Sequence, residues 1–168
     1  MTKMFKWTQE AFIKVSSSGD DTIFPGDLDL SSETLAVSSP YEDANQSTIT
    51  NGTASSSDYS KTNSGAVYIY QRSGSTWSQQ AYIKASNNYE ETLFGNSISL
   101  DENTLAVGAR NESSNQTTIT NGTASSTDTS KIASGAVYIY QRSGATWSQQ
   151  AYIKAENSDS TDMFGTLV

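Results

Sequence analysis

An eight-residue segment returns in this chain at a fixed interval. It reads Trp-Thr-Gln-Glu-Ala-Phe-Ile-Lys at 7–14 and Trp-Ser-Gln-Gln-Ala-Tyr-Ile-Lys at both 77–84 and 147–154, so the period is 70 residues. A period of this length indicates one supersecondary unit copied along the chain. Such units bury their apolar faces against their neighbours, and we therefore expect the fold to be that of an array.

Composition, charge and missing residue types exclude several classes of structure and function. The chain is rich in Ser, Thr and Asn, which prefer turns and strand surfaces, and we expect no helix. Its net charge of −8 repels phosphate backbones and anionic lipids, so nucleic acid is not an expected partner. The absence of Cys and His removes disulfides, thiol or imidazole nucleophiles and the usual zinc sites.

The sequence gives no sign of membrane insertion. No run approaches the ~20 apolar residues that a membrane-spanning helix needs. Residues 1–10 lack the apolar core of a signal peptide, so we expect an export signal to lie outside these 168 residues.

Each period contains short apolar runs separated by turn signals. In the second copy the four runs are 94–100, 104–109, 135–140 and 147–154, and the same four occupy 24–84 in the first copy. The first two runs are joined by a short polar turn and predict a hairpin. The run 135–140 is apolar or aromatic at every position past its glycine, which predicts a strand covered on both faces.

Antiparallel strands buried on both faces and repeated without helices predict an all-β fold of β-propeller-type, four-stranded blades. A sandwich, which would leave one face of each strand polar, and a β-solenoid, which would need shorter coils, are the alternatives. The predicted division is an outer strand of a preceding blade at 1–15, blades at 16–84 and 85–154, and the first strand of a third blade at 155–168. Since both terminal pieces lack the two middle strands, we expect a longer array or assembly with other copies.

Three segments carry a family resemblance. Phe94-Gly95, the Leu-Ala-Val-Gly-Ala of 105–109 and the Gly-Ala-Val-Tyr-Ile-Tyr of 135–140 resemble the FG-GAP repeat of integrin-alpha-like β-propellers. The Trp-x-Gln-Gln-Ala-Tyr-Ile-Lys-Ala segment between units is similar to that of bacterial-type FG-GAP arrays. The resemblance implies a non-catalytic module that acts outside the cell or at its surface.

The chain departs from this pattern in two places. The first copy has Phe24-Pro25-Gly26 for Phe-Gly and Ser38-Ser39-Pro40 for Gly-Ala-Pro, and the second has Arg110 for the proline. Integrin-like repeats can hold calcium in an Asp-x-Asp-x-Asp-Gly loop, but the matching turns here are Ser-Ser-Glu at 31–33 and Asp-Glu-Asn at 101–103. The resemblance therefore implies no calcium at these turns.

The long polar connection between the second and third runs of each period contains candidate modification sites. Glycosylation acceptor patterns begin at Asn45, Asn51, Asn111, Asn115 and Asn121. These triplets predict glycans on a surface loop, or arise by chance in an Asn- and Thr-rich segment. The stretches 48–55 and 118–125 are identical, so the loop either covers a blade edge with Ile49 or Ile119 or simply records a recent duplication.

Acidic residues near these loops are the candidates for a calcium site. They are Glu42, Asp43 and Asp58 in the first copy and Glu112 and Asp128 in the second. The regular ligand spacing of calcium loops is missing, so a solvated acidic surface is the alternative. We expect no other cofactor.

Six aromatic residues recur at the period and are expected to pack between blades. They are Trp7, Trp77, Trp147, Phe24, Phe94 and Phe164. Stacking of an exposed tryptophan on a sugar or protein partner is the alternative. We interpret Lys14, Lys84 and Lys154 as solvated strand ends and not as catalytic amines.

The sequence predicts a non-catalytic extracellular or cell-surface module, structural or adhesive, that meets a protein or glycan partner. Self-assembly into a ring or filament through strands supplied by another copy is the alternative. A carboxylate-based hydrolase is a further alternative, although no acidic pair breaks the symmetry of the repeat.

Overall fold

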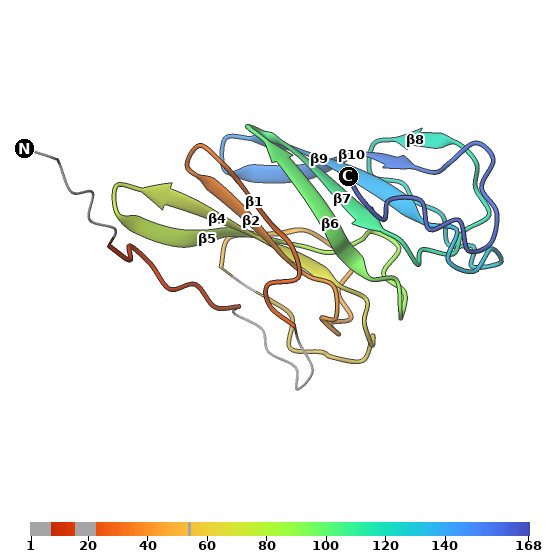
Figure 1. Cartoon of the computed structure of the whole chain (residues 1–168), viewed down its shortest axis with the longest axis horizontal. Coiled ribbons are helices and arrows are strands. Elements are labelled where there is room, and N and C mark those ends of the chain that lie inside the picture. The colour runs from red at the N-terminus through yellow and green to blue at the C-terminus, as the bar shows by residue number, and fades with distance from the viewer. Residues whose placement is uncertain (1–7, 16–22, 54) are drawn as a thin grey trace, which may run out of the picture.

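The computed structural model describes residues 8–15, 23–53 and 55–168, and these form two antiparallel five-stranded sheets (Figure 1). The described residues contain no helix, which confirms the all-β prediction. No helix able to cross a membrane exists in this part of the chain. The two sheets have the same strand order and repeat the 70-residue period of the sequence.

The first sheet has the order β1-β2-β4-β5-β3. Its strands are β1 (Leu28–Ser31), β2 (Thr34–Ser39), β3 (Thr50–Asn51), β4 (Ala66–Ser73) and β5 (Thr76–Ile83). The second sheet has the order β6-β7-β9-β10-β8. Its strands are β6 (Phe94–Asp101), β7 (Thr104–Ala109), β8 (Ile119–Asn121), β9 (Ala136–Ser143) and β10 (Thr146–Ile153). The four predicted runs of each copy are therefore strands, and a fifth strand joins each sheet.

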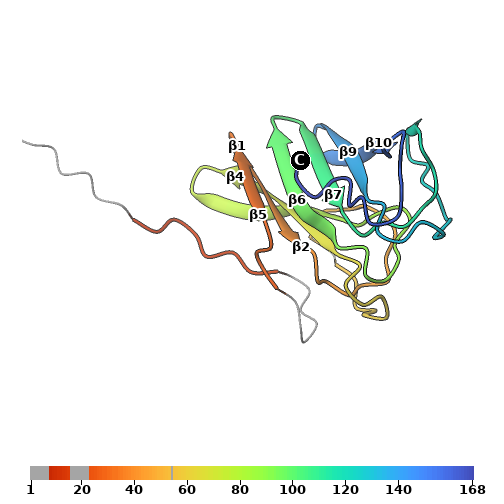
Figure 2. The ribbon, with the colours of Figure 1, turned by 45° about the vertical axis from the view of Figure 1, so that its right-hand side comes forward.

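The two sheets pack against each other through β6, which lies beside β1 and β2 (Figures 1 and 2). One apolar cluster crosses the boundary: Ile69 and Ile83 of the first sheet pack with Leu105, Tyr140 and Trp147 of the second. This shared cluster is the expected arrangement for units that cannot bury both faces alone.

Strands β4 and β9 are the centre of each sheet. Residues 66–70 of β4 are all buried, as predicted for a strand that is covered on both faces. Ring pairs repeat in the same register: Phe24 meets Tyr68 edge-on with centroids 6.0 Å apart, and Phe94 meets Tyr138 edge-on at 5.3 Å. Edge-to-face contacts of this kind add to the stabilisation from burial.

The fifth strand comes from the identical stretches of the polar connection. Thr50 and Asn51 of β3 pair with Tyr82 and Ala81 of β5, and β8 pairs with β10 in the same way. The interpretation that this loop covers a sheet edge is confirmed. Ile49 packs against the core, whereas Ile119 is 60% exposed.

The terminal pieces differ from the expectation. Residues 8–15 are extended but belong to no strand, and Trp7 lies outside the described residues. In 155–168 the predicted first strand is reduced to a parallel bridge between Gly135 and Phe164. A strand needs a hydrogen-bonding partner along its length, and neither piece has a neighbouring strand of its own repeat among the described residues.

Candidate functional site

The seam between the two sheets, where β1, β2, β3, β4 and β5 face β6, β9 and β10, is held by hydrogen bonds from side chains of both sheets. Side chains of β1 and of the residue before it accept hydrogen bonds from backbone N–H groups of β6 and of the turn that follows β6. The pairs are Asp27 Oδ2 with Ile98 N (2.9 Å), Asp29 Oδ2 with Leu100 N (2.7 Å) and Ser31 Oγ with Glu102 N (3.0 Å). These side chains satisfy donors that a sheet edge would otherwise leave open.

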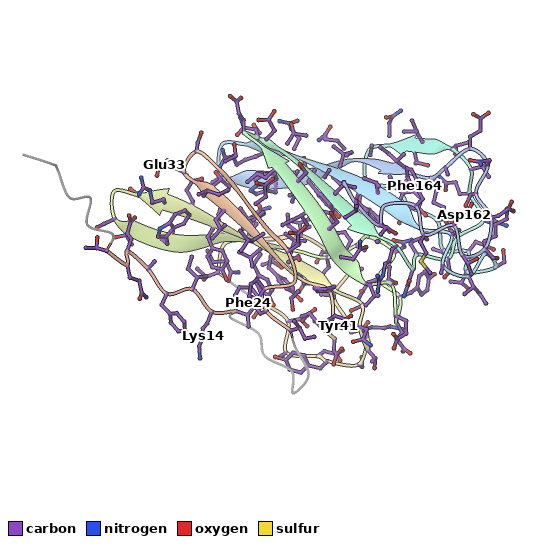
Figure 3. The ribbon with its side chains drawn as sticks, in the orientation of Figure 1. Lys14, Phe24, Glu33, Tyr41, Asp162 and Phe164 are labelled. Carbon is purple, nitrogen blue, oxygen red and sulfur yellow. The ribbon has the colours of Figure 1, made fainter. Side chains whose placement is uncertain are left out.

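The same contact recurs one period later. The backbone N–H of Val168 donates to Ser97 Oγ at 3.2 Å. Ser97 and Val168 follow Asp27 and Ile98 by 70 residues each, so this hydrogen bond corresponds to the one between Asp27 and Ile98. Figure 3 shows Phe164, which precedes this contact, on the side of the molecule that carries Asp162 and away from Phe24 and Lys14. The second sheet therefore begins a second seam of the same design.

Close backbone contact in the seam depends on glycine. Gly65 has φ +83°, and a Cβ atom there would lie 2.1 Å from the Phe94 carbonyl oxygen. Phe94 N donates to Ser64 O at 3.2 Å, which fixes this approach. Gly135 and Phe164 repeat the arrangement, with φ +83° and a Cβ distance of 2.1 Å. The Phe-Gly of one repeat thus meets the Gly-Ala of the repeat before it.

The outer part of the seam is built around Trp147, which is 1% exposed. Its backbone N–H donates to Asn51 Oδ1 at 2.9 Å, and its indole Nε1 donates to Gln80 Oε1 at 2.9 Å. Arg142 lies over the indole at 5.6 Å and donates to Gln71 Oε1 at 2.6 Å. Polar side chains of the first sheet therefore hold Trp147 and Arg142 of the second sheet in place through hydrogen bonds.

We expect Asn51→Ala to lower the free energy of unfolding by about 1 kcal/mol, because Trp147 N loses its acceptor. Asn121 occupies the same place in the identical stretch, is exposed, and serves as the matched control. Asn121→Ala should change stability by less than about 0.5 kcal/mol. Urea denaturation followed by tryptophan fluorescence measures both, and equal losses would show that the Asn51 contact contributes nothing.

Each repeat also contains a buried ion pair next to its sheet. Lys84 Nζ lies 2.7 Å from Glu42 Oε2 and 2.8 Å from Ser64 Oγ, and both charged side chains are 0% exposed. Lys154 and Glu112 repeat the pair at 2.7 Å. The interpretation of Lys84 and Lys154 as solvated strand ends was therefore wrong. Each lysine directly follows the last residue of β5 or β10, and a buried carboxylate pairs with its ammonium group.

The electrostatics of these pairs follow from their burial. Burial lowers the pKa of the Lys84 ammonium, and the neighbouring Glu42 carboxylate opposes that change. Burial lowers the pKa of Lys154 in the same way, and the hydrogen bond that Lys154 donates to Glu112 opposes that change. Both carboxylates are enclosed with their ammonium partners, so neither faces solvent as a calcium ligand would at the surface.

The other calcium candidates lie at the loop surface. Asp43 Oδ1 accepts from Asn63 N at 2.8 Å. Hydrogen bonds from Ser60 and then Asn45 lower the pKa of Asp58, and those from Ser130 lower the pKa of Asp128. These carboxylates order the loop turns. In the described ranges no group of three or more acidic, His or Cys side chains is placed to hold a metal ion.

The predicted glycosylation residues lie in different surroundings. Asn45, Asn51, Asn115 and Asn121 are exposed and Asn111 is half-buried. Asn51 alone of the five holds the backbone of Trp147. Glycosylation of these residues stays a prediction.

The recurring aromatic residues are also placed unequally. Trp147 and Phe94 are buried in the seam, whereas their counterparts Trp77 and Phe24 on the first sheet are half-buried. Phe164 is half-buried beside Gly135. Trp147 and Phe94, which face the first sheet, are thus more buried than the residues that precede them by one period.

A cavity of about 320 Å³ lies in the seam between Ile49, Lys84, Tyr140 and Trp147. The Tyr140 hydroxyl is buried and has no hydrogen-bond partner among the described residues. Burial raises its pKa well above the usual range. An unsatisfied buried hydroxyl carries a desolvation penalty, so this position is a weak point of the packing.

We therefore expect Tyr140→Phe to leave stability unchanged or to raise it by about 1 kcal/mol. Tyr138→Phe is the control, because the Tyr138 hydroxyl donates to Asn87 Oδ1 and its loss leaves that oxygen unsatisfied. Thermal unfolding followed by circular dichroism compares the two. A larger loss for Tyr140→Phe than for Tyr138→Phe would contradict the assignment.

Repeated antiparallel sheets that bury each other's faces define a β-propeller-type repeat protein, although the described residues do not close into a ring. Within this class, residues 77–140, from β5 to β9, match the family model of the FG-GAP repeat. Repeats of this family are generally structural and non-catalytic. No curated protein matches the chain.

Proposed function

We propose that the chain is a non-catalytic structural and adhesive module that works outside the cell or on its surface. The seam is the observation that carries the proposal. Its charged, amide and aromatic side chains hold one repeat against the next, and this leaves the long loops for contact with a partner. The repeat family supports a structural role, and the negative net charge favours a protein or glycan partner over nucleic acid.

The loops are suited to binding because they are held in shape before a partner arrives. Asn45 N donates to Asp58 O at 2.8 Å, and Lys61 N donates to Asp43 O at 2.8 Å. Lys131 N donates to Ser113 O at 2.9 Å in the other repeat. A pre-ordered loop loses less conformational entropy on binding than a mobile one.

The carboxylates offer little support for the hydrolase alternative. Glu42 and Glu112 are each enclosed with a lysine, and a buried ion pair is not placed to protonate or attack a glycoside. We assign the acidic residues to loop shape and internal pairing.

Binding of the purified chain to arrays of glycans and of extracellular matrix proteins tests the adhesive role. A variant with residues 55–59 and 125–129 replaced by Gly and Ser should lose at least about tenfold in affinity, which is about 1.4 kcal/mol. Substitution of the exposed hairpin tips, Ser75→Asn with Ala145→Asn, is the control and should bind normally. Equal binding by the loop variant, or labelling of cells by antibody only after permeabilisation, would contradict the proposal.

Self-assembly is a second candidate, and one observation favours it. The residues that form the two halves of the seam recur, one period away, on the two outer faces of the pair of sheets, and several of them are exposed there. A module of this kind would build a ring or filament from copies of itself.

A further inference from the structure

The outer face of the first sheet carries the same apolar residues that the second sheet buries in the seam. The buried residues Ile98 (5%), Leu100 (6%), Leu105 (0%) and Trp147 (1%) correspond, 70 residues earlier, to Leu28 (57%), Leu30 (57%), Leu35 and Trp77, the last two half-buried. We call these last four residues the open face of the first sheet. The equivalent apolar side chains of the second sheet are almost completely shielded from solvent.

The outer face of the second sheet carries the matching half. The residues of the first sheet that receive Trp147 and Arg142 are Thr34, Asn51, Gln71 and Gln80. Their counterparts are the identical types Thr104, Asn121, Gln141 and Gln150, and we call these four residues the open face of the second sheet. Thr104, Asn121 and Gln150 are exposed there.

We propose that the open face of the second sheet in one copy binds the open face of the first sheet in another copy. The contact reproduces the internal seam: Asn121 receives the backbone of Trp77, and Gln150 receives its indole. Leu28 and Leu30 then enter the environment that buries Ile98 and Leu100. Because the two faces differ, the association is head-to-tail and continues into a ring or a filament.

Residues 8–15 show that the open face of the first sheet accepts a strand-like partner. Tyr70 Oη donates to Lys14 O at 3.2 Å, and Arg72 pairs with Glu10 at 3.0 Å. Glu10 precedes Gln80 by one period, so this segment lies on the first sheet where β5 lies on the second. Its cover is partial, since Leu28 and Leu30 stay more than half exposed. A second copy would displace it with β10 and add the rest of a sheet.

Disulfide trapping tests the geometry directly, because the chain has no cysteine of its own. Within the seam, Ser31 Oγ lies 3.0 Å from Glu102 N, and the corresponding pair between copies is Asp101 with Ser32. Asp101→Cys and Ser32→Cys chains, mixed at about 1 mM and oxidised, should give the mixed dimer at least about tenfold above either homodimer. The Ser31→Cys with Glu102→Cys chain is the control, and should form an intrachain disulfide. Statistical mixing of the dimers while this control closes would overturn the proposal.

Light scattering with size exclusion gives an independent test. The mass of the wild-type chain should rise above 18.1 kDa with concentration. Leu30→Arg, at a position exposed enough to tolerate the change, should stay at 18.1 kDa, whereas Ser57→Arg in an exposed loop should behave like the wild type. A wild-type mass of 18.1 kDa at all concentrations up to about 1 mM would overturn the inference.

The inference rests on the structural part of the proposed function and not on the adhesive part, and one variant separates them. Leu30→Arg should lose association while its loops bind the arrayed glycan or protein partner with unchanged affinity. Association without partner binding would defeat only the adhesive role. Partner binding by a wild-type chain that never associates would defeat only the inference.

Discussion

Glu42→Gln is expected to lower the free energy of unfolding by about 3–5 kcal/mol. The substitution keeps the shape of the side chain but leaves the Lys84 ammonium without its counter-charge, at a site where both side chains are 0% exposed. Ser64 Oγ, at 2.8 Å, supplies only a neutral dipole. Such a loss is a large fraction of the stability of a small domain, so partial unfolding at room temperature is expected.

Urea denaturation measures this loss, and two further variants make it interpretable. The double variant Glu42→Gln with Lys84→Met removes both charges and should recover much of the stability. Lys61→Met breaks the exposed pair with Glu90, whose atoms are 3.8 Å apart, and should cost less than about 1 kcal/mol. If Glu42→Gln does not express, Glu112→Gln repeats the test in the second sheet. A Glu42→Gln chain within about 1 kcal/mol of the wild type would refute the importance of the pair.

Gly65→Ala is expected to cost about 3 kcal/mol and to loosen the seam. The added Cβ would lie 2.1 Å from the Phe94 carbonyl oxygen, so the backbone of the second sheet must move. The positive φ of +83° adds about 1–2 kcal/mol for a residue with a side chain, and overpacking adds about 1–3 kcal/mol.

Gly74→Ala separates these two contributions. Gly74 lies in the β4–β5 hairpin with φ +63° and has no atom within 4 Å of an added Cβ, so only the backbone cost of about 1–2 kcal/mol applies. Fluorescence of Trp147, which is buried in the seam, should shift to longer wavelength in Gly65→Ala and not in Gly74→Ala. Equal destabilisation of the two variants, with no spectral difference, would mean that the close approach is relaxed at little cost.

The strands and the repeat were predictable because hydrophobic pattern and turn residues are local signals. The runs 94–100 and 135–140 appear as β6 and β9 with small changes at their ends. Run 24–30 is the exception, since β1 begins only at Leu28. Pro25 lacks the N–H that a paired strand residue donates, and the sequence contains that reason.

The fifth strands could not be predicted in the same way. β3 has two residues and β8 has three, too few for an alternating pattern to appear. These residues form strands because they pair with the edge of β5 or β10, and that edge exists only in the folded sheet. The identity of 48–55 and 118–125 indicated only that the loop had one shape.

The buried ion pairs were missed because charged residues are normally exposed, and that rule governed the interpretation of Lys84 and Lys154. One signal was available. Glu42 precedes Lys84 by the same number of residues as Glu112 precedes Lys154, so each pair keeps its register through the duplication. Whether each glutamate meets its lysine depends on the folded structure. There, Ser64 Oγ and Ser134 Oγ each accept a further hydrogen bond from the lysine.

The seam has a consequence for how such proteins change in length over evolution. Both halves of the contact, the Asn51 side and the Trp147 side, are encoded within a single period. A gene duplication of one whole period therefore creates a new pair of matched surfaces at once, with no substitution required. A duplication of any other length would separate Phe-Gly from the Gly-Ala it must meet. Selection can thus lengthen or shorten the array only in whole steps of 70 residues.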